Sequence, residues 1–178
     1  GQYDGGYSWN AARYPWRIGL DYLMYGDPRA LYTLTAFNRW ARSTTHDEPG
    51  AFNSGYRIDG SAIEEDQNEP AFVAALGVSA MISPDNQPWL NNIWDNLQRR
   101  SIRDHDYYNT LKLLGMVIMS GHWERPQPAP IKKTAHVPVD PSSGIAAPGP
   151  VASLPPAPQL MLARGFSFKK LLGRRGFS

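Results

Sequence analysis

Residues 70–82 read Pro-Ala-Phe-Val-Ala-Ala-Leu-Gly-Val-Ser-Ala-Met-Ile, and this stretch decides the fold. Drawn as a helix, it is apolar around nearly its whole circumference, and such a helix has to be surrounded by other elements. No β-type alternation of useful length occurs in the chain. We therefore expect an all-α protein in which this helix lies in an inner layer and amphipathic helices flank it.

Four further helices are expected, two before residues 70–82 and two after them. Apolar residues recur at helical spacing in the helices that flank the buried one, proline stands in the first turn of the first two, and Gly26 ends the first. The expected ranges are about 11–25, 28–43, 88–100 and 106–120. Short loops predict that successive helices pack as antiparallel hairpins. Because five helices do not close a two-layered ring, we expect an incomplete one.

The 178 residues fall into three parts by composition. Residues 1–125 hold 18 of the 21 aromatic side chains, and their 11 basic and 15 acidic groups give a net charge of −4, which suits a folded domain. Residues 126–158 contain 10 of the 16 prolines and predict an extended linker. Residues 159–178 are basic and include three glycines, so we expect a disordered tail, with a basic membrane or partner anchor as the alternative.

Composition also excludes several classes of protein and site. No apolar run approaches 18 residues, so a membrane span is excluded, and no signal peptide is visible. The negative charge of residues 1–125 disfavours nucleic acid as a partner. Without cysteine, disulfides and thiolate metal sites are excluded. The four histidines match neither a zinc pattern nor a catalytic triad, so no metal and no cofactor are expected.

Residues 44–69 form a long segment without periodicity, which indicates either a functional loop or a wrong assignment. Its end, residues 64–69, reads Glu-Glu-Asp-Gln-Asn-Glu. No histidine stands at ligand spacing and no EF-hand pattern is present. We interpret these carboxylates as solvated loop charges rather than a metal site.

Aromatic and polar residues are concentrated in residues 7–30. Asn10 and Arg13 would lie where the first helix begins, beside rings that can stack on the C–H face of a sugar. This mixture suits a saccharide. The alternative is that Asn10 is only a helix N-cap and the rings belong to the core. Four other tryptophans are expected to pack between helices: Trp16, Trp40, Trp89 and Trp94.

Three ordered segments carry a resemblance to a known family. Residues 10–23 read Asn-Ala-Ala-Arg-Tyr-Pro-Trp-Arg-Ile-Gly-Leu-Asp-Tyr-Leu, and they resemble the Tyr-Asp-Ala-x-Arg-x-Pro-Trp-Arg segment of glycoside hydrolase family 8. Residues 71–81 with 86–95 resemble the late helical pair of that family, and residues 107–123 resemble its closing helix. The resemblance covers about residues 7–125.

The resemblance implies an (α/α)6 toroid of six hairpins, of which residues 1–125 would be the C-terminal part. It implies an endo-acting, inverting hydrolase of cellulose, β-glucan or chitosan, secreted or periplasmic. Inversion needs a carboxylic acid and a separate base across a gap of roughly 6.5–9.5 Å. The family's acidic glutamate lies in earlier helices, and its motif is absent from this chain. The fragment alone is therefore expected to be inactive, with a polysaccharide as partner and no obligate protein partner.

The resemblance also assigns the site. Asn10 occupies the place of the family's base, but a neutral amide cannot accept a proton, so Asn10 cannot be that base. In a branch of the family that includes chitosanases, asparagine stands here and the base is a glutamate upstream; Asp4 is the only nearby upstream carboxylate in this chain. Arg13 matches the cleft arginine, with a terminal ion pair as the alternative role.

Aromatic residues complete the expected substrate-binding set. Trp9 stands where the family has tyrosine, which keeps a stacking surface and loses a hydroxyl. Tyr107 or Tyr108 resembles a cleft tyrosine. Two rival functions stay open: a non-catalytic carbohydrate-binding or scaffold half-ring, and an unrelated α/α-toroid such as a cyclase or lyase.

Overall fold

A computed structural model describes residues 5–63, 66–100 and 105–124. The expected linker, the tail and Asp4 lie outside these ranges. The described residues form five α-helices, two short 3-10 turns and only isolated β-bridges, which confirms the all-α class. The helices are α1 (Tyr14–Tyr25), α2 (Pro28–Thr45), α3 (Pro70–Ala80), α4 (Gln87–Arg99) and α5 (Asp106–Met119), and the 3-10 turns are η1 (Pro49–Ala51) and η2 (Pro84–Asn86).

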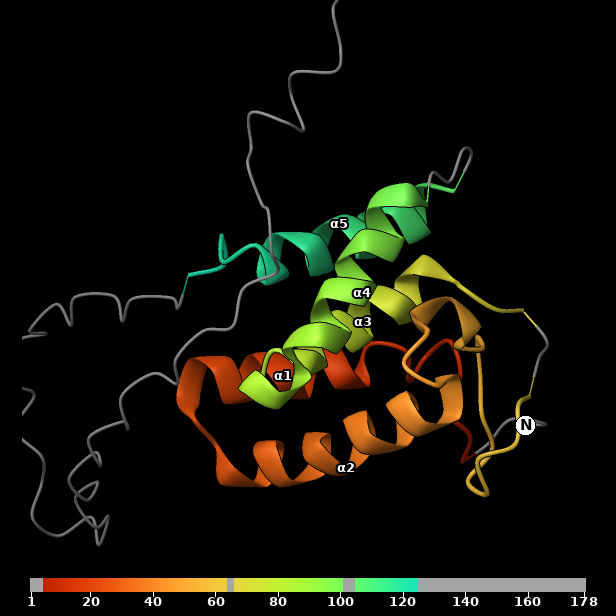
Figure 1. The fold of residues 1–178 in the computed structure, drawn as a ribbon, viewed down its shortest axis with the longest axis horizontal. Coiled ribbons are helices and arrows are strands. Elements are labelled where there is room, and N and C mark those ends of the chain that lie inside the picture. The colour runs from red at the N-terminus through yellow and green to blue at the C-terminus, as the bar shows by residue number, and fades with distance from the viewer. Residues whose placement is uncertain (1–4, 64–65, 101–104, 125–178) are drawn as a thin grey trace, which may run out of the picture.

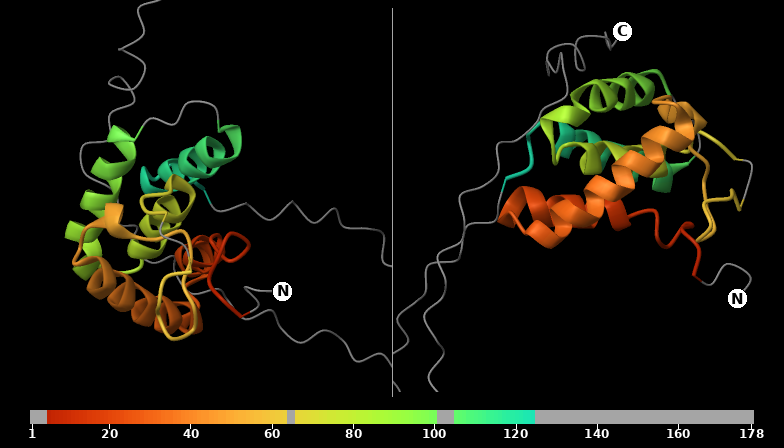
Figure 2. Two further views of the ribbon diagram at one scale, coloured as in Figure 1. Left: turned by 90° about the vertical axis from the view of Figure 1, so that its right-hand side faces the viewer. Right: turned by 60° about the horizontal axis from the view of Figure 1, so that its bottom comes forward.

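The helices lie in two layers, and α3 is the central helix of the inner layer (Figure 1). All residues of α3 are buried, because α1 packs on one side of it, α5 on another and α4 on a third. Figure 2 shows α2 and α4 together outside the row of α1, α3 and α5. The sequence-based expectation of one buried helix with flanking amphipathic helices is confirmed.

Close backbone contact holds the inner row together. A Cβ atom on Gly115 of α5 would lie 2.8 Å from the Cβ of Ala74, and a Cβ on Gly19 of α1 would lie 3.1 Å from the carbonyl oxygen of Val78. Larger side chains at these glycines would force the helices apart. Ala74 and Gly77 of α3 face Gly115 and Met119 of α5 in the same order. Phe72 and Val78 likewise face Trp9 and Gly19 in order, so α1, α3 and α5 begin at the same end of the domain.

The outer layer is tied to the inner one by a buried polar pair. Asn38 of α2 donates a hydrogen bond from Nδ2 to the Ser79 carbonyl oxygen at 2.9 Å, and Ser79 Oγ donates to Asn38 Oδ1 at 3.1 Å. Trp89 and Trp94 are buried, and Trp16 and Trp40 are half-buried against the same core, which confirms their packing role. Because buried polar groups are costly without partners, the Asn38–Ser79 pair favours one register of α2 on α3.

The irregular segment after α2 anchors the start of the chain. The backbone amides and carbonyls of Tyr7 and Tyr56 exchange two hydrogen bonds of 2.8 Å. Tyr56 is buried beside Phe52, and the ring of Trp40 lies 4.8 Å from the ring of Tyr56. This segment therefore has a structural role, in that it holds the residues before α1 against the core.

One helix boundary differs notably from expectation. α1 begins at Tyr14 rather than near residue 11, because the amides of Ala11 and Ala12 both bond to the Ser8 carbonyl in a turn that precedes the helix. Pro15 lies in the first turn, as expected. None of the described helices combines the length and apolarity needed to cross a membrane.

Candidate functional site

The starts of α1, α3 and α5 meet at one end of the domain. The ring of Trp9, just before α1, lies 5.0 Å from the ring of Phe72 in the first turn of α3. It also lies 5.1 Å from the ring of Tyr108 in the first turn of α5. Residues that are up to 99 positions apart in the chain are thus neighbours.

Trp9 and Tyr108 brace one another. Their rings are stacked at an interplanar angle of 22°, and the ring of His105 lies 5.0 Å from Tyr108 at 31°. Trp9 is only partly exposed and packs against the core. Tyr108 covers one face of the indole, so stacking of a sugar on Trp9 stays a prediction for its other face.

Tyr107 is the more accessible of the two tyrosines. Its side chain is 48% exposed, and its hydroxyl accepts a hydrogen bond of 2.9 Å from Nη1 of Arg13. The bond joins α1 to α5 across the end of α3. Among the described residues Arg13 has no carboxylate partner. A terminal ion pair with residues 1–4, the alternative role of Arg13, would lie outside the described ranges.

Asn10 is exposed and lines an open cavity of about 440 Å³. The N-cap position of α1 belongs to Arg13, and no side chain caps it, so the interpretation of Asn10 as an N-cap is wrong. An exposed amide can donate to one sugar hydroxyl and accept from another. The cavity is lined by Gly5, Gly6, Tyr7, Asn10, Ala11, Arg13, Tyr14 and Arg17.

Two of these lining residues were not anticipated from the sequence. Tyr14 is 44% exposed and Arg17 is exposed. Arg17 stands four residues after Arg13, and residues at that spacing share a helix face. The four-residue spacing could therefore have identified Arg17 as a neighbour of Arg13 from the sequence alone. Tyr7, by contrast, faces the core, and burial raises the pKa of its hydroxyl far above the usual value.

Glu69 was expected to be a solvated loop charge, and that expectation is wrong. It precedes α3 at the same end of the domain, and its Oε1 atom is buried without a hydrogen-bond partner. Burial raises the pKa of the Glu69 carboxyl, although the charges of Arg100 and His105 act in the opposite direction. Asp66, which is exposed, raises it slightly further.

Replacing Glu69 by glutamine is expected to stabilise the protein at neutral pH. The folded state holds the Glu69 proton more tightly than the unfolded chain does, so the stabilising contribution of this group is complete below its unfolded pKa of about 4 and is lost as the pH rises through the raised folded pKa. Chemical unfolding of both proteins from acid to neutral pH measures this. The advantage of Glu69→Gln should disappear at acid pH.

The control for this experiment is Glu48→Gln, because Glu48 is exposed. This variant should follow the pH profile of the unaltered protein. A Glu69→Gln protein that is less stable than the unaltered one at neutral pH would contradict the burial of this carboxyl.

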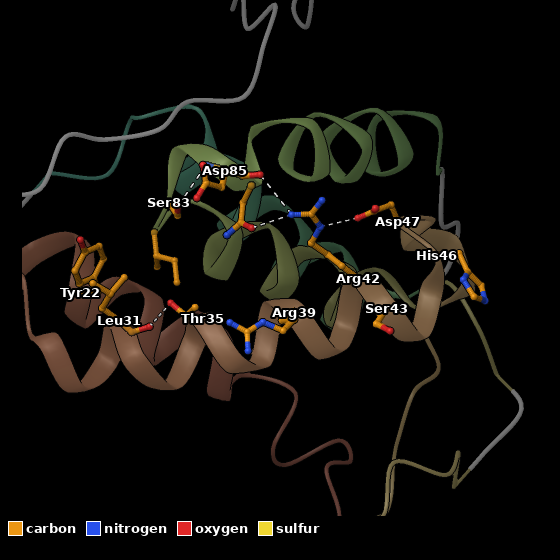
Figure 3. A pocket seen from close by; sticks show the side chains of 12 residues that line it. Tyr22, Leu31, Thr35, Arg39, Arg42, Ser43, His46, Asp47, Ser83 and Asp85 are labelled. Carbon is orange, nitrogen blue, oxygen red and sulfur yellow. Dashed lines mark hydrogen bonds and ion pairs between the residues drawn. The ribbon is translucent and has the colours of Figure 1, made fainter.

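A second cavity, of about 740 Å³, lies along α2 and the connection from α3 to α4 (Figure 3). Arg42 crosses it and forms an ion pair of 2.6 Å with Asp47, and it also reaches the Asn86 side-chain oxygen at 3.3 Å. None of the residues that the sequence singled out for sugar binding lines it. Within the described ranges, no three histidine or acidic side chains converge as metal ligands.

Comparison with known proteins gives relatives of one kind. The chain is 41% identical over 123 residues to a beta-glucanase of Niallia circulans, a match that covers 69% of this chain and 30% of the relative. It is 30% identical over 127 residues to an endoglucanase of Bacillus sp. (strain KSM-330), covering 71% of this chain and 27% of that protein. No protein-family model matches the chain.

A solved structure agrees with these relatives. The apo structure of a beta-1,3-1,4-glucanase from Paenibacillus sp. X4 superposes with a TM-score of 0.65 at 40% identity, and the match covers 69% of this chain and 32% of that one. The chain thus spans about a third of the length of the proteins it matches. These similarities support a relationship to glycoside hydrolases.

Proposed function

We propose that residues 1–125 are the C-terminal part of an (α/α)6 ring of glycoside hydrolase family 8, and that the complete enzyme cleaves β-glucan internally with inversion. Residues 126–158 are then a linker and residues 159–178 a basic tail of a secreted or periplasmic protein. The relatives named glucanases support this reading. Another support is the uneven covering of the inner row: α3 is buried throughout, whereas α1 and α5 expose Tyr25 and Leu113.

The observation that carries the proposal is the bond between Arg13 and Tyr107. It places a cationic donor, an exposed aromatic ring and the Asn10 amide at one end of the inner helices. A sugar ring binds by stacking its C–H face on such a ring while planar polar groups hold its hydroxyls. In this role Tyr107, rather than Tyr108, is the cleft tyrosine.

The described residues would orient a sugar and would not cleave it. Inverting hydrolysis needs one carboxylic acid to protonate the leaving oxygen and one carboxylate to take a proton from water. Asn10 is uncharged and cannot take that proton. In this proposal both carboxyl groups come from other parts of the enzyme, so the chain alone binds glucan weakly and releases no reducing ends.

Glucan is preferred to chitosan for a local electrostatic reason. Among the described residues, the cavity beside Asn10 is lined by Arg13 and Arg17 and by no acidic side chain. Two guanidinium groups repel the ammonium groups of chitosan at short range. The net charge of −4 over residues 1–125 acts in the other direction, but salt screens the charges that lie far from the cavity.

Tyr107→Ala is expected to weaken cellotetraose binding about tenfold, because loss of an aromatic platform costs about 1 kcal/mol or more. Calorimetric titration of the chain with cellotetraose measures this. Tyr32→Ala is the matched control, because Tyr32 is 81% exposed on the outer helix α2 and should contribute nothing. Equal effects of the two substitutions, or no binding of cellotetraose, would contradict the proposed site.

A further inference from the structure

Positive charge predominates among the described residues that line the cavity beside Asn10. Arg13 and Arg17 lie one helical turn apart on α1 and both line it, and none of the eight lining residues is acidic. The only side-chain partner of Arg13 among the described residues is the neutral Tyr107 hydroxyl. Arg17 has no side-chain partner within the described ranges.

Two other arginines in the described residues are paired with carboxylates. Arg42 forms an ion pair of 2.6 Å with Asp47 in the second cavity, where the arginine is therefore already neutralised (Figure 3). Arg29 forms one of 2.6 Å with Asp27. The carboxylate nearest to Arg17 along the helix, Asp21, forms no ion pair with it.

We propose that this cavity is a subsite for an acidic sugar, in which Arg13 and Arg17 bind the carboxylate of a uronic acid residue. The proposal rests on the proposed saccharide function and narrows its substrate to glucans that carry glucuronate units. The planar guanidinium groups match a carboxylate in shape and charge. The cavity has a volume of about 440 Å³, which falls within the range of binding sites for small molecules.

The uncharged lining groups suit the remainder of such a sugar. The Asn10 amide and the Tyr14 hydroxyl can bond to ring hydroxyls, and the exposed Tyr14 ring can contact a C–H face. The bond from Arg13 to Tyr107 connects this subsite to the exposed ring of Tyr107. A β-linked chain could therefore place one unit at Tyr107 and an acidic unit at the arginines.

The test compares two disaccharides that differ in one group. Cellobiouronic acid carries a C6 carboxylate where cellobiose carries a hydroxymethyl group. At low salt and neutral pH the acid should bind the full-length chain about tenfold more tightly than cellobiose, because a charge-assisted hydrogen bond is stronger than one between neutral groups. The chitosan dimer should bind more weakly than cellobiose. Added salt should reduce the preference for the acid.

Two arginine variants test whether the preference for cellobiouronic acid over cellobiose arises in this cavity. Arg17→Gln should reduce the tenfold ratio to near one, whereas Arg39→Gln should leave it unchanged, because Arg39 is exposed on α2 and lines the other cavity. Thermal unfolding of both variants verifies that they fold. A preference that survives Arg17→Gln, or one that Arg39→Gln also removes, would overturn the proposal.

Further outcomes separate the subsite from the proposed function. If cellotetraose binds at Tyr107 and the two disaccharides bind equally, the acidic subsite is wrong and the glucan site stands. If acetate or phosphate binds as tightly as cellobiouronic acid, the cavity is a general anion site and the sugar assignment is overturned. If no saccharide binds, both proposals fail.

Discussion

In a full-length relative whose matching region is replaced by residues 1–124 of this chain, Arg13→Ala is expected to lower kcat/KM on β-glucan about a hundredfold. The substitution removes the bond to Tyr107 and a cation at the cleft, and a displacement of about 1 Å at a reacting centre costs about a factor of one hundred. The beta-glucanase of Niallia circulans is a suitable host, since it is 41% identical to this chain over 123 residues. Release of reducing ends measures the effect.

Two comparisons make this experiment decisive. The chimaera with Arg39→Ala should keep its activity, because Arg39 lies on the outer helix α2 and lines the other cavity. The chain by itself should release no reducing ends. Hydrolysis by the isolated chain, lost on Arg13→Ala, would show that it contains its own acid and base and would refute the proposed division of the enzyme.

Phe72→Ala is expected to lower the free energy of unfolding by about 3–5 kcal/mol, the usual cost of emptying a buried aromatic site. Phe72 is fully buried in the first turn of α3, and its ring lies 5.7 Å from Tyr7 and 5.0 Å from Trp9. The void left by Phe72→Ala would remove packing contacts from the core and from the segment before α1, which contains Tyr7 and Trp9. Urea unfolding followed by tryptophan fluorescence measures the loss.

Phe72→Leu is the control for this substitution, because it keeps most of the apolar volume and should cost clearly less. A loss below about 1 kcal/mol for Phe72→Ala would mean that Trp9 is not held by α3 as the structure shows. Sugar binding should fall with stability in Phe72→Ala, because Trp9 braces Tyr108 and Tyr108 adjoins Tyr107.

The sequence predicted the helices better than the site. An apolar run such as residues 70–82 has no stable place except the interior, so local pattern alone indicated the buried helix. The start of α1 was placed three residues too early, because the hydrogen bonds of Ala11 and Ala12 to Ser8 depend on how the preceding segment is held by Tyr56.

Long-range packing explains the other differences. Tyr107 and Tyr108 are adjacent in the sequence, and their roles separate only because Tyr108 stacks on Trp9, which is 99 positions away in the chain. Glu69 appeared to belong to a solvated acidic run, yet the fold buries one of its oxygens. The resemblance singled out Arg13 and Asn10 from the sequence, whereas the contact of Arg13 with Tyr107 became visible only in the structure.

The central claim is that the end of the domain where α1, α3 and α5 begin binds glucan. Cellotetraose titrated into isotopically labelled chain, with NMR shift changes assigned to residues, tests this most directly. We predict that the changes concentrate at Asn10, Arg13 and Tyr107 and leave Arg39 and Arg42 unaffected. Changes confined to the cavity around Arg42, or no changes at saturating sugar, would contradict the claim.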